Sequence, residues 1–254
     1  MEPPGFSEQE SQRAEAILAE LISAEQWRVY DPVIRAARAA GLRFSIGGGI
    51  AFSLYSGHRR NTKDLDIFIL PEDRRAFIQL MARSGFEEFV DYPYDKVLSY
   101  RGACRGFIMD VLWSMLNGRA SFDAGWVERG WRISMAGLPL SLLPPEELIW
   151  TKLYILRRDR CDWPDLLALF KTMGPRLDWE HLLGRLGEDA PVLGGVLHLY
   201  QWLCPGAAGE LPGWIWERCG LLPGRRDRRR PAVDAARVAL FGGADWFPEQ
   251  PHDF

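Results

Sequence analysis

The sequence predicts an α/β (α+β) protein, in which a small mixed β-sheet with flanking helices precedes a helical C-terminal domain. Short apolar runs separated by glycines and turn residues occupy the chain to about residue 142. After Pro144-Pro145 the apolar residues recur at helical spacing. A chain of 254 residues, 47% of them apolar, is long enough to bury a sizeable core. We therefore predict two domains, residues 1–142 and 143–254.

The N-terminal segments predict two helices that cover the sheet. Residues 7–24 begin with Ser7 and Glu10 at capping-box spacing and continue with an apolar stripe. Asp31-Pro32 has the pattern of an N-cap followed by a first-turn proline, and Gly41 follows as a terminator. We therefore expect the second helix to begin at Asp31.

The central stretch predicts a strand, a glycine turn, a short helix, a basic loop and a second strand. The apolar run 42–46 breaks on Gly47, Gly48 and Gly49, and a helix-like segment covers 50–55. The basic loop 58–63 leads to Asp64-Leu65-Asp66, which begins the apolar run 67–70.

Further elements follow in order along the chain. A helix is predicted from Pro71 to Gly85. Strands are predicted at 86–90, 97–100 and 107–113, the last two joined by a turn over Arg101–Gly106, and a short pair at 131–142. The C-terminal domain has predicted helices at 146–158, 163–173, 179–186 and 192–203, and the chain beyond Gly206 is poorly periodic.

The Asp-x-Asp pair indicates a cation site. Residues two apart on a strand point to the same side, so Asp64 and Asp66 project from one face. Adjacent carboxylates repel each other unless a cation neutralises them, and Mg²⁺ prefers oxygen ligands. For an isolated pair the alternative is a solvated strand end.

The glycines and the basic loop indicate a phosphate site beside these carboxylates. Glycines allow the close approach of a ligand to the backbone, and the start of a helix favours anions. Arg59, Arg60 and Lys63 add positive charge to the loop. Together these features predict a site for a metal–nucleotide complex.

In this order the residues resemble the signature of the DNA polymerase β-type nucleotidyltransferase superfamily, namely Gly48-Gly49-x-Ala51 and then Gly57-x-x-Arg60-x-Thr62-x-Asp64-x-Asp66. The closer resemblance is to minimal bacterial members, including the abortive-infection toxin nucleotidyltransferases and the antibiotic (aminoglycoside and lincosamide) nucleotidyltransferases. Gly49 stands where many members have Ser, a departure that several antibiotic-modifying members share. The resemblance implies a nucleotidyltransferase core and assigns nucleotide or phosphate binding to Gly48, Gly49, Arg60 and Thr62.

Asp110 is the candidate third acid. It interrupts the apolar run 107–112, where a charge is costly unless it is paired or binds a metal. The alternative is a polar residue at the sheet edge. The resemblance makes Asp64, Asp66 and Asp110 both the metal ligands and the catalytic acids. It implies two Mg²⁺ ions, with Mn²⁺ as a substitute, and Asp110 would accept the proton of the attacking hydroxyl.

Lys152 is a further candidate, because it falls within an apolar stripe of the helix predicted from residue 146. The resemblance implies that it reaches the triphosphate, and the alternative is a lysine that snorkels from the border of the stripe. Asp162 and Asp165 resemble a later motif of the abortive-infection toxins. Their positions also match the cap and first turn of the next helix, which is the reading we favour.

Composition limits the partners. A net charge of −3 does not indicate bulk attraction to nucleic acid. The basic run 225–230 could follow an RNA or DNA phosphate backbone, but Pro223, Gly224 and Pro231 around it favour a solvated loop. The four cysteines lack zinc spacing, no apolar run is long enough for a membrane span, and the sequence MEPPGFSEQE lacks the layout of a secretion signal. We therefore expect a cytoplasmic protein with reduced thiols and no membrane partner.

The predicted function is transfer of a nucleoside monophosphate from an NTP such as ATP to an acceptor hydroxyl, with release of pyrophosphate. The acceptor stays open between RNA or protein, as for a toxin with an antitoxin partner, and a small alcohol, as for an antibiotic-type adenylyltransferase. We favour the toxin type slightly. Two other classes are kept, a glycosyltransferase, which also uses Asp-x-Asp, and a non-catalytic nucleotide-binding or interaction module.

Overall fold

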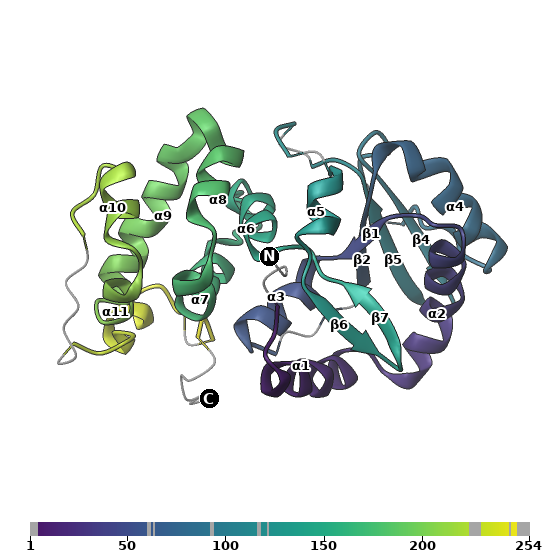
Figure 1. Ribbon diagram of the computed structural model, residues 1–254, viewed down its shortest axis with the longest axis horizontal. Coiled ribbons are helices and arrows are strands. Elements are labelled where there is room, and N and C mark those ends of the chain that lie inside the picture. Colours follow the sequence, from purple (N-terminus) through teal and green to yellow (C-terminus); the bar gives the residue numbers. More distant parts are fainter. Residues whose placement is uncertain are drawn as a thin grey trace. The chain divides into compact units, whose positions relative to one another are not determined.

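The computed structural model describes residues 5–59, 62, 64–91, 94–115, 118–120, 122–223, 230–243 and 245–247. The chain forms two compact units (Figure 1). The first consists of Met1–Leu54 and Arg59–Pro144, and the second of Tyr55–His58 and Pro145–Phe254. That residues 1–142 and 143–254 are separate domains stays a prediction.

A five-stranded mixed sheet forms the centre of the first unit. Its spatial order is β1-β2-β5-β4-β3, and the strands are β1 (Phe44–Ile46), β2 (Asp64–Ile69), β3 (Glu87–Glu88), β4 (Ser99–Cys104) and β5 (Phe107–Leu112). The central pair β2 and β5 is parallel, and the other neighbours are antiparallel. This confirms the predicted α/β (α+β) class with a mixed sheet. It also places Asp110 on a central strand, so the sheet-edge alternative for this residue is wrong.

Helices precede, connect and follow the strands of this sheet. Helices α1 (Glu8–Leu21) and α2 (Ala24–Ala39) precede it, α3 (Gly48–Ser56) joins β1 to β2, and α4 (Arg74–Arg83) follows β2 after the 3₁₀ turn η1 (Pro71–Asp73). Of the two N-terminal helices predicted to cover the sheet, α2 contacts β5 and α4, whereas the main contacts of α1 are with strand β6 (Arg132–Met135) of a second, two-stranded sheet (Figure 1). Leu65 and Ile67 on β2 and Met109 on β5 are completely buried, so this sheet forms the core of the unit.

The predicted start of the second helix is wrong. Helix α2 begins after Ser23, which forms a capping box with Gln26, and it runs through Pro32 without ending. The capping box satisfies two terminal N–H groups, while Asp31 pairs with Arg35 one turn later instead of capping. The observed helix therefore begins seven residues before the predicted start at Asp31.

Ser23→Ala is expected to destabilise the first unit by about 1 kcal/mol, because the N–H of Gln26 loses its acceptor at the start of α2. Urea denaturation followed by circular dichroism measures the change. Ser11→Ala, in the body of α1 and away from its capping residue, is the control and should leave the midpoint within error of the wild type. Equal midpoints for Ser23→Ala and the control would contradict the capping role.

The β4–β5 hairpin differs from its predicted form. Strand β4 extends to Cys104, and the turn consists of Arg105 and Gly106 alone, both with positive φ. Two positive φ values are typical of the tight type I′ turn, whose twist matches that of the strands. Arg101, predicted in the turn, therefore lies within β4, directly opposite Asp110.

A second small sheet completes the first unit. Strands β6 (Arg132–Met135) and β7 (Leu138–Ser141) form a hairpin at Ala136–Gly137, which confirms the short pair predicted at 131–142. Helix α5 (Ala124–Glu128) places Trp126 beside Phe68 of β2. On β2, Phe68 is two residues after Asp66 and therefore lies on the same face of the sheet as Asp64 and Asp66. The aromatic contact with Trp126 covers the end of this face that is farther from Asp64.

The described elements of the second unit are helices. They are α6 (Pro145–Leu153), α7 (Trp163–Met173), α8 (Trp179–Leu186), α9 (Ala190–Leu203), α10 (Gly213–Arg218) and α11 (Ala235–Ala239), with 3₁₀ turns η2 (Gly174–Arg176), η3 (Gly187–Asp189) and η4 (Ala207–Glu210). Helix α6 ends at Leu153, before the predicted end at Arg158, and Leu156 beyond it is exposed.

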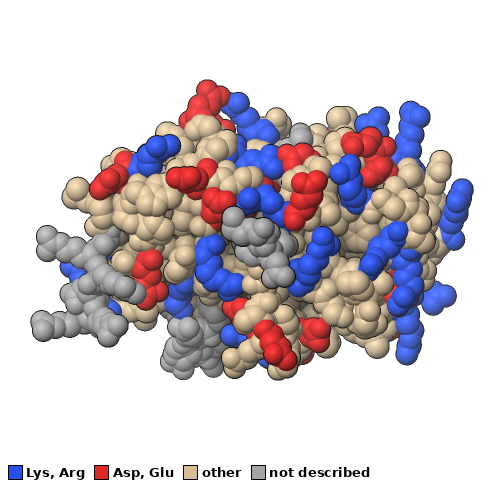
Figure 2. Space-filling view, in the orientation of Figure 1, with Lys and Arg blue, Asp and Glu red and all other residues tan. Residues whose placement is uncertain are grey.

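Among the described residues, none of the helices has both the length and the apolar character needed to span a bilayer. Figure 2 shows basic and acidic side chains interspersed over the face that it draws. On this face, therefore, the two signs of charge are mixed, and the net charge of the sequence is −3.

Candidate active site

Three carboxylates meet where β2 and β5 run side by side. Asp64 and Asp66 alternate with buried Leu65 along β2, and the parallel register places Asp66 next to Asp110. One oxygen from each of the three side chains lies within 4.8 Å of the others. The structure therefore brings together the three acids that the sequence predicts, in an arrangement that could hold a metal ion.

Asp110 is held by an arginine that the sequence analysis did not identify as a site residue. Arg101 Nε donates to Asp110 Oδ1 and Arg101 Nη2 donates to Oδ2, each at 2.6 Å. Asp110 is only 8% exposed, and the pairing satisfies a charge that would be costly to bury alone. The hydrogen bonds to Asp110, with further attraction to Asp64 and Asp66, raise the pKa of Arg101. The guanidinium is thus part of the electrostatics of all three acids.

Tyr30 of α2 is a second residue that sequence reasoning missed. Its hydroxyl donates to the backbone carbonyl of Ile108 at 2.9 Å, and Ile108 is paired with Asp64 in the sheet. Burial raises the pKa of Tyr30, and the three acids raise it further. The neutral phenol therefore anchors α2 to β5 next to the acids. Tyr30 belongs to the apolar face of α2, so its sequence pattern alone indicates a core residue.

The glycine turn lies directly against Asp66. Gly47 N–H donates to the Asp66 carbonyl at 3.0 Å, and Gly48 has a φ of +55°. A Cβ at position 48 would overlap the Asp66 carboxylate, so both the backbone conformation and the available space require glycine. Helix α3 begins at Gly48, so its first turn starts beside the Asp66 carboxylate.

Thr62 and Gly49 also lie together. A Cβ at position 49 would overlap the Thr62 Cγ2 methyl group, so a Ser at this position would require the threonine to move. Arg60, the predicted phosphate ligand of the basic loop, lies outside the described residues. The structure thus places Gly48, Gly49 and Thr62 at one end of β2, and their predicted role in phosphate binding stays a prediction.

Lys152 belongs to the second unit and lies in a buried ion-pair network. Its Nζ donates to Asp162 at 2.9 Å and to Asp165 at 2.6 Å, and the lysine is 5% exposed. The snorkelling alternative is therefore wrong. Asp162 occupies the N-cap position of α7, but its side chain makes no capping bond and instead accepts from Lys152 and Arg160. The favoured capping role of this carboxylate is wrong as well, and contact of Lys152 with a triphosphate stays a prediction.

Lys152→Met is expected to destabilise the second unit by about 3–5 kcal/mol, because two buried carboxylates lose their shared cation. Burial opposes ionisation of Asp162, but Arg160 and Lys152 outweigh it and lower the pKa from 3.8 to about 2. A lowered carboxyl pKa contributes stability above the unfolded value, and that stability is lost as the pH falls towards the folded value. The wild type should therefore lose about 2 kcal/mol between about pH 4 and pH 2, and the variant less.

Urea denaturation at several pH values measures both effects. Arg218→Met, at an exposed position of α10, is the control for loss of a positive charge. Destabilisation no larger in Lys152→Met than in this control would contradict a structural role for the network.

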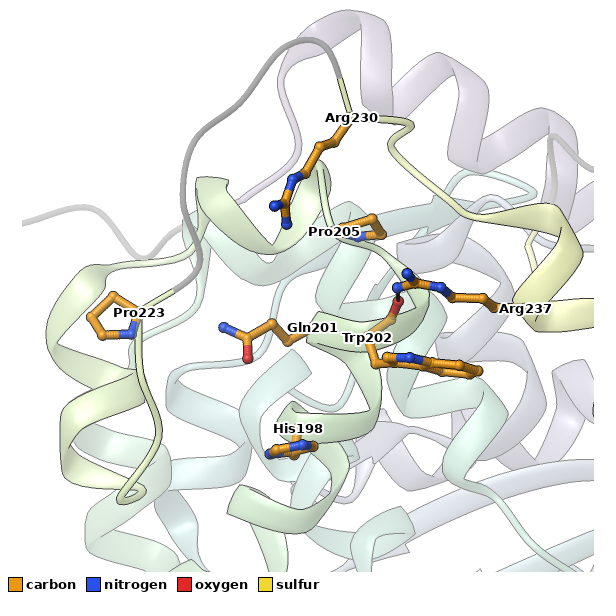
Figure 3. Close-up of a pocket in the computed structure, with 7 residues that line it drawn as sticks. All are labelled: His198, Gln201, Trp202, Pro205, Pro223, Arg230 and Arg237. Carbon is orange, nitrogen blue, oxygen red and sulfur yellow. Dashed lines mark hydrogen bonds between the residues drawn. The ribbon is translucent and has the colours of Figure 1, made fainter.

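A cavity of about 300 Å³ lies in the second unit (Figure 3). Its lining residues come from positions 198 to 237, much later in the chain than the three acids. Its lining includes His198, Trp202 and Arg237. The polar groups partly satisfy one another, because Arg237 donates to the Trp202 carbonyl at 2.5 Å and also pairs with Asp234. We assign this cavity no ligand. Of the basic run 225–230, only Arg230 is among the described residues, where it lines the cavity, and the rest of the run lies outside them.

No protein-family model matches the chain, and no curated protein matches it. Solved structures similar to it include the antibiotic-resistance factor ANT(2'')-Ia, at 16% identity and a TM-score of 0.45, covering 71% of this chain and 100% of that one. The lincomycin-bound lincosamide antibiotic adenylyltransferase LnuA is similar at 14% identity and a TM-score of 0.41, covering 58% and 96%. An antigenic nucleotidyltransferase-like protein from Paracoccidioides brasiliensis is similar at 17% identity and a TM-score of 0.40, covering 70% and 94%. Because these identities and TM-scores are low, we base the function on the geometry of the site.

Proposed function

We propose that the chain is a metal-dependent nucleotidyltransferase that moves a nucleoside monophosphate from an NTP to an acceptor hydroxyl and releases pyrophosphate. The observation behind this proposal is the meeting of Asp64, Asp66 and Asp110 beside a glycine turn. A non-catalytic binding module would need neither three converging acids nor a turn packed against one of them. Catalysis by positioning and charge stabilisation needs both.

The donor set fits a hard divalent cation. Three carboxylates supply only oxygen ligands, which Mg²⁺ and Mn²⁺ accept, and one oxygen from each acid is close enough to share an ion. Asp64, Asp66 and Asp110 would hold it. When bound, the metal would neutralise phosphate charge and lower the pKa of the attacking hydroxyl. We expect two Mg²⁺ ions during turnover, as the resemblance implies.

The phosphate groups would lie at the start of α3. Gly48 and Gly49 begin this helix without side chains that would obstruct their backbone N–H groups, and the helix start favours anions. Thr62 would donate a hydroxyl hydrogen bond, and Arg60 of the same loop would add positive charge. These residues orient the triphosphate so that the α-phosphorus faces the acceptor and pyrophosphate leaves on the opposite side.

The chain's own acids then have separate roles. Asp64 and Asp66 lie on one strand and would fix the nucleotide end of the site through the cation they hold. Asp110 comes from the neighbouring strand and would accept the proton as the acceptor oxygen attacks. Arg101 would keep the carboxylate of Asp110 in place during this step.

The acceptor defines the biological role. The toxin-type interpretation, with RNA or protein as acceptor and an antitoxin as partner, remains our preferred expectation from the sequence. The small-alcohol acceptor of an antibiotic-type adenylyltransferase is the alternative. No feature of the described residues favours one of them, so the assay needs all three acceptor classes.

The test is incubation of the full chain with each α-labelled NTP and Mg²⁺, in separate reactions with total RNA, bulk protein and a panel of small alcohols. Label in one pool with release of pyrophosphate supports the proposal and identifies the acceptor class. Failure to label any pool with any NTP would contradict it. Calorimetry with NTP and Mg²⁺, beside a nucleotide sugar and Mn²⁺, tests the glycosyltransferase alternative, which requires binding of the sugar nucleotide.

A further inference from the structure

Arg101 holds both oxygens of Asp110, the acid on β5. The two hydrogen bonds have the same length, 2.6 Å, and they come from two different guanidinium nitrogens. This is the planar, two-pronged geometry that arginine forms with carboxylates and that lysine cannot form. The hairpin register sets it up, because Arg101 is the direct cross-strand partner of Asp110.

The guanidinium restricts what Asp110 can offer to a cation. Each carboxylate oxygen has two lone pairs, and one on each oxygen is taken by Arg101. The χ2 angle of an aspartate otherwise has a broad distribution, so without the two hydrogen bonds from Arg101 the carboxylate plane would rotate more freely. With Arg101 in place, one remaining lone pair can point towards Asp66, which is the adjacent residue across the parallel pair.

The guanidinium also supplies charge where three carboxylates are crowded. One oxygen of each acid lies within 4.8 Å of the others, and like charges at this separation repel. The Arg101 side chain is 23% exposed and that of Asp110 is 12% exposed, so solvent screens their interaction only in part. A fixed positive charge therefore lowers the repulsion among the acids, and it would also repel an incoming metal ion.

We propose that Arg101 is a positioning residue with two functions, namely to act as a built-in counter-cation of the three acids before metal binds and to fix the carboxylate plane of Asp110 for catalysis. The inference rests on the proposed function, because it takes the three acids as a cation site. It goes beyond that function by assigning a role to a residue on β4, a strand that contributes none of the three acids.

The two functions respond differently to substitution. Arg101→Gln removes the positive charge and the pair of hydrogen bonds to Asp110. Without metal, the variant should therefore be less stable than the wild type. It should bind Mn²⁺ about tenfold more tightly than the wild type and gain more stability from added metal. Turnover should nevertheless fall about tenfold to a hundredfold, because Asp110 is less well oriented. Tighter metal binding with slower turnover is a combination that loss of general stability does not produce.

Arg101→Lys separates charge from geometry. A lysine keeps the positive charge, so the melting temperature without metal and the affinity for Mn²⁺ should return towards the wild-type values. The compact ammonium cannot make both parallel hydrogen bonds, so turnover should stay low. Arg132→Gln removes an exposed arginine from another strand of the same unit and is the matched control, expected to match the wild type in every measurement.

The experiment combines isothermal titration of the 254-residue chain with MnCl₂, thermal melting in chelator and in MnCl₂, and transfer rates. Binding of Mn²⁺ that is tighter in Arg101→Gln, with larger metal-induced stabilisation, supports the inference. Equal affinity and equal stabilisation in the wild type and Arg101→Gln would overturn it while leaving the metal-dependent function intact. Absence of Mn²⁺ binding by the wild type, by contrast, would overturn the metal site itself and this inference with it.

Discussion

Asp66→Asn is expected to lower nucleotidyl transfer by about a thousandfold or more while the chain keeps its fold. The amide has nearly the shape of the carboxylate but loses the negative charge that would bind a divalent cation. Asp66 shares β2 with Asp64 and is paired with Asp110 on β5, so its loss removes one of the three converging carboxylates. Asp64→Asn should have the same effect. Transfer of label from an α-labelled NTP gives the rate.

Because the three carboxylates repel one another, replacing one of them with a neutral amide should not destabilise the metal-free chain. The melting temperature of the variant without metal should therefore equal or exceed that of the wild type. Asp91→Asn, an exposed aspartate of the same unit, is the control and should retain wild-type transfer. Wild-type transfer by either Asp64→Asn or Asp66→Asn would remove the catalytic assignment. Loss of transfer with a collapsed melting temperature would instead show that these acids have a structural role.

Gly48→Ala is expected to abolish transfer, with a loss of stability of more than about 2 kcal/mol. The substitution meets two obstacles, since the φ of +55° is unfavourable for alanine and the new Cβ overlaps the Asp66 carboxylate. Relief requires movement of either the turn or the carboxylate, and both belong to the candidate site. Thermal melting and transfer rates, measured on the same preparation, give the two effects.

The chain offers a control that separates these obstacles. Gly41 has a φ of +70°, but a Cβ there would meet nothing within 4 Å. Gly41→Ala should therefore cost only the backbone strain, about 1 kcal/mol, and leave transfer unchanged. If Gly48→Ala behaved like Gly41→Ala in both stability and activity, close packing of the turn against Asp66 would have no functional meaning.

The acidic site could be predicted because its signals are local. Two carboxylates two residues apart on a strand must share a face, and an acid within an apolar run needs a partner. Glycines before a helix are also visible in the sequence. The resemblance then supplied what local chemistry could not, namely that Asp110 belongs beside Asp64 and Asp66. The meeting of the three is a property of the parallel register, which a single sequence does not show.

Arg101 was missed for a physical reason. Its neighbourhood in the sequence, with two glycines and few apolar residues, is typical of a turn, and the predicted turn extended from Arg101 to Gly106. The strand continues because tertiary pairing with β3 and β5 outweighs the weak local preference. The signal in the sequence that could have identified Arg101 is the dipeptide Arg105-Gly106. If these two residues alone form the hairpin turn, Arg101 lies opposite Asp110 on the neighbouring strand.

Two errors in the helices have related causes. Asp31-Pro32 has the residues of a helix start, but the capping box of Ser23 and Gln26 begins α2 earlier and the helix accommodates the proline. Asp162 has the position of a cap, but burial beside Lys152 and Arg160 gives its carboxylate stronger partners than a backbone N–H. In each case the sequence contained a local helix-start motif, and another interaction, a second cap or a buried ion pair, was more stable. The spacing of the residues does not show which interaction is the more stable.

The tight turn at Arg105-Gly106 has a consequence for how this chain can change over generations. The turn fixes the pairing of β4 with β5, and one extra residue in β4 between Arg101 and the turn would shift the pairing of Arg101 by a single step and send its side chain to the opposite face of the sheet. The arginine would then point away from the acid it holds. An exposed hairpin, ordinarily a place where insertions accumulate freely, is therefore expected to keep a fixed length for as long as this pair is needed.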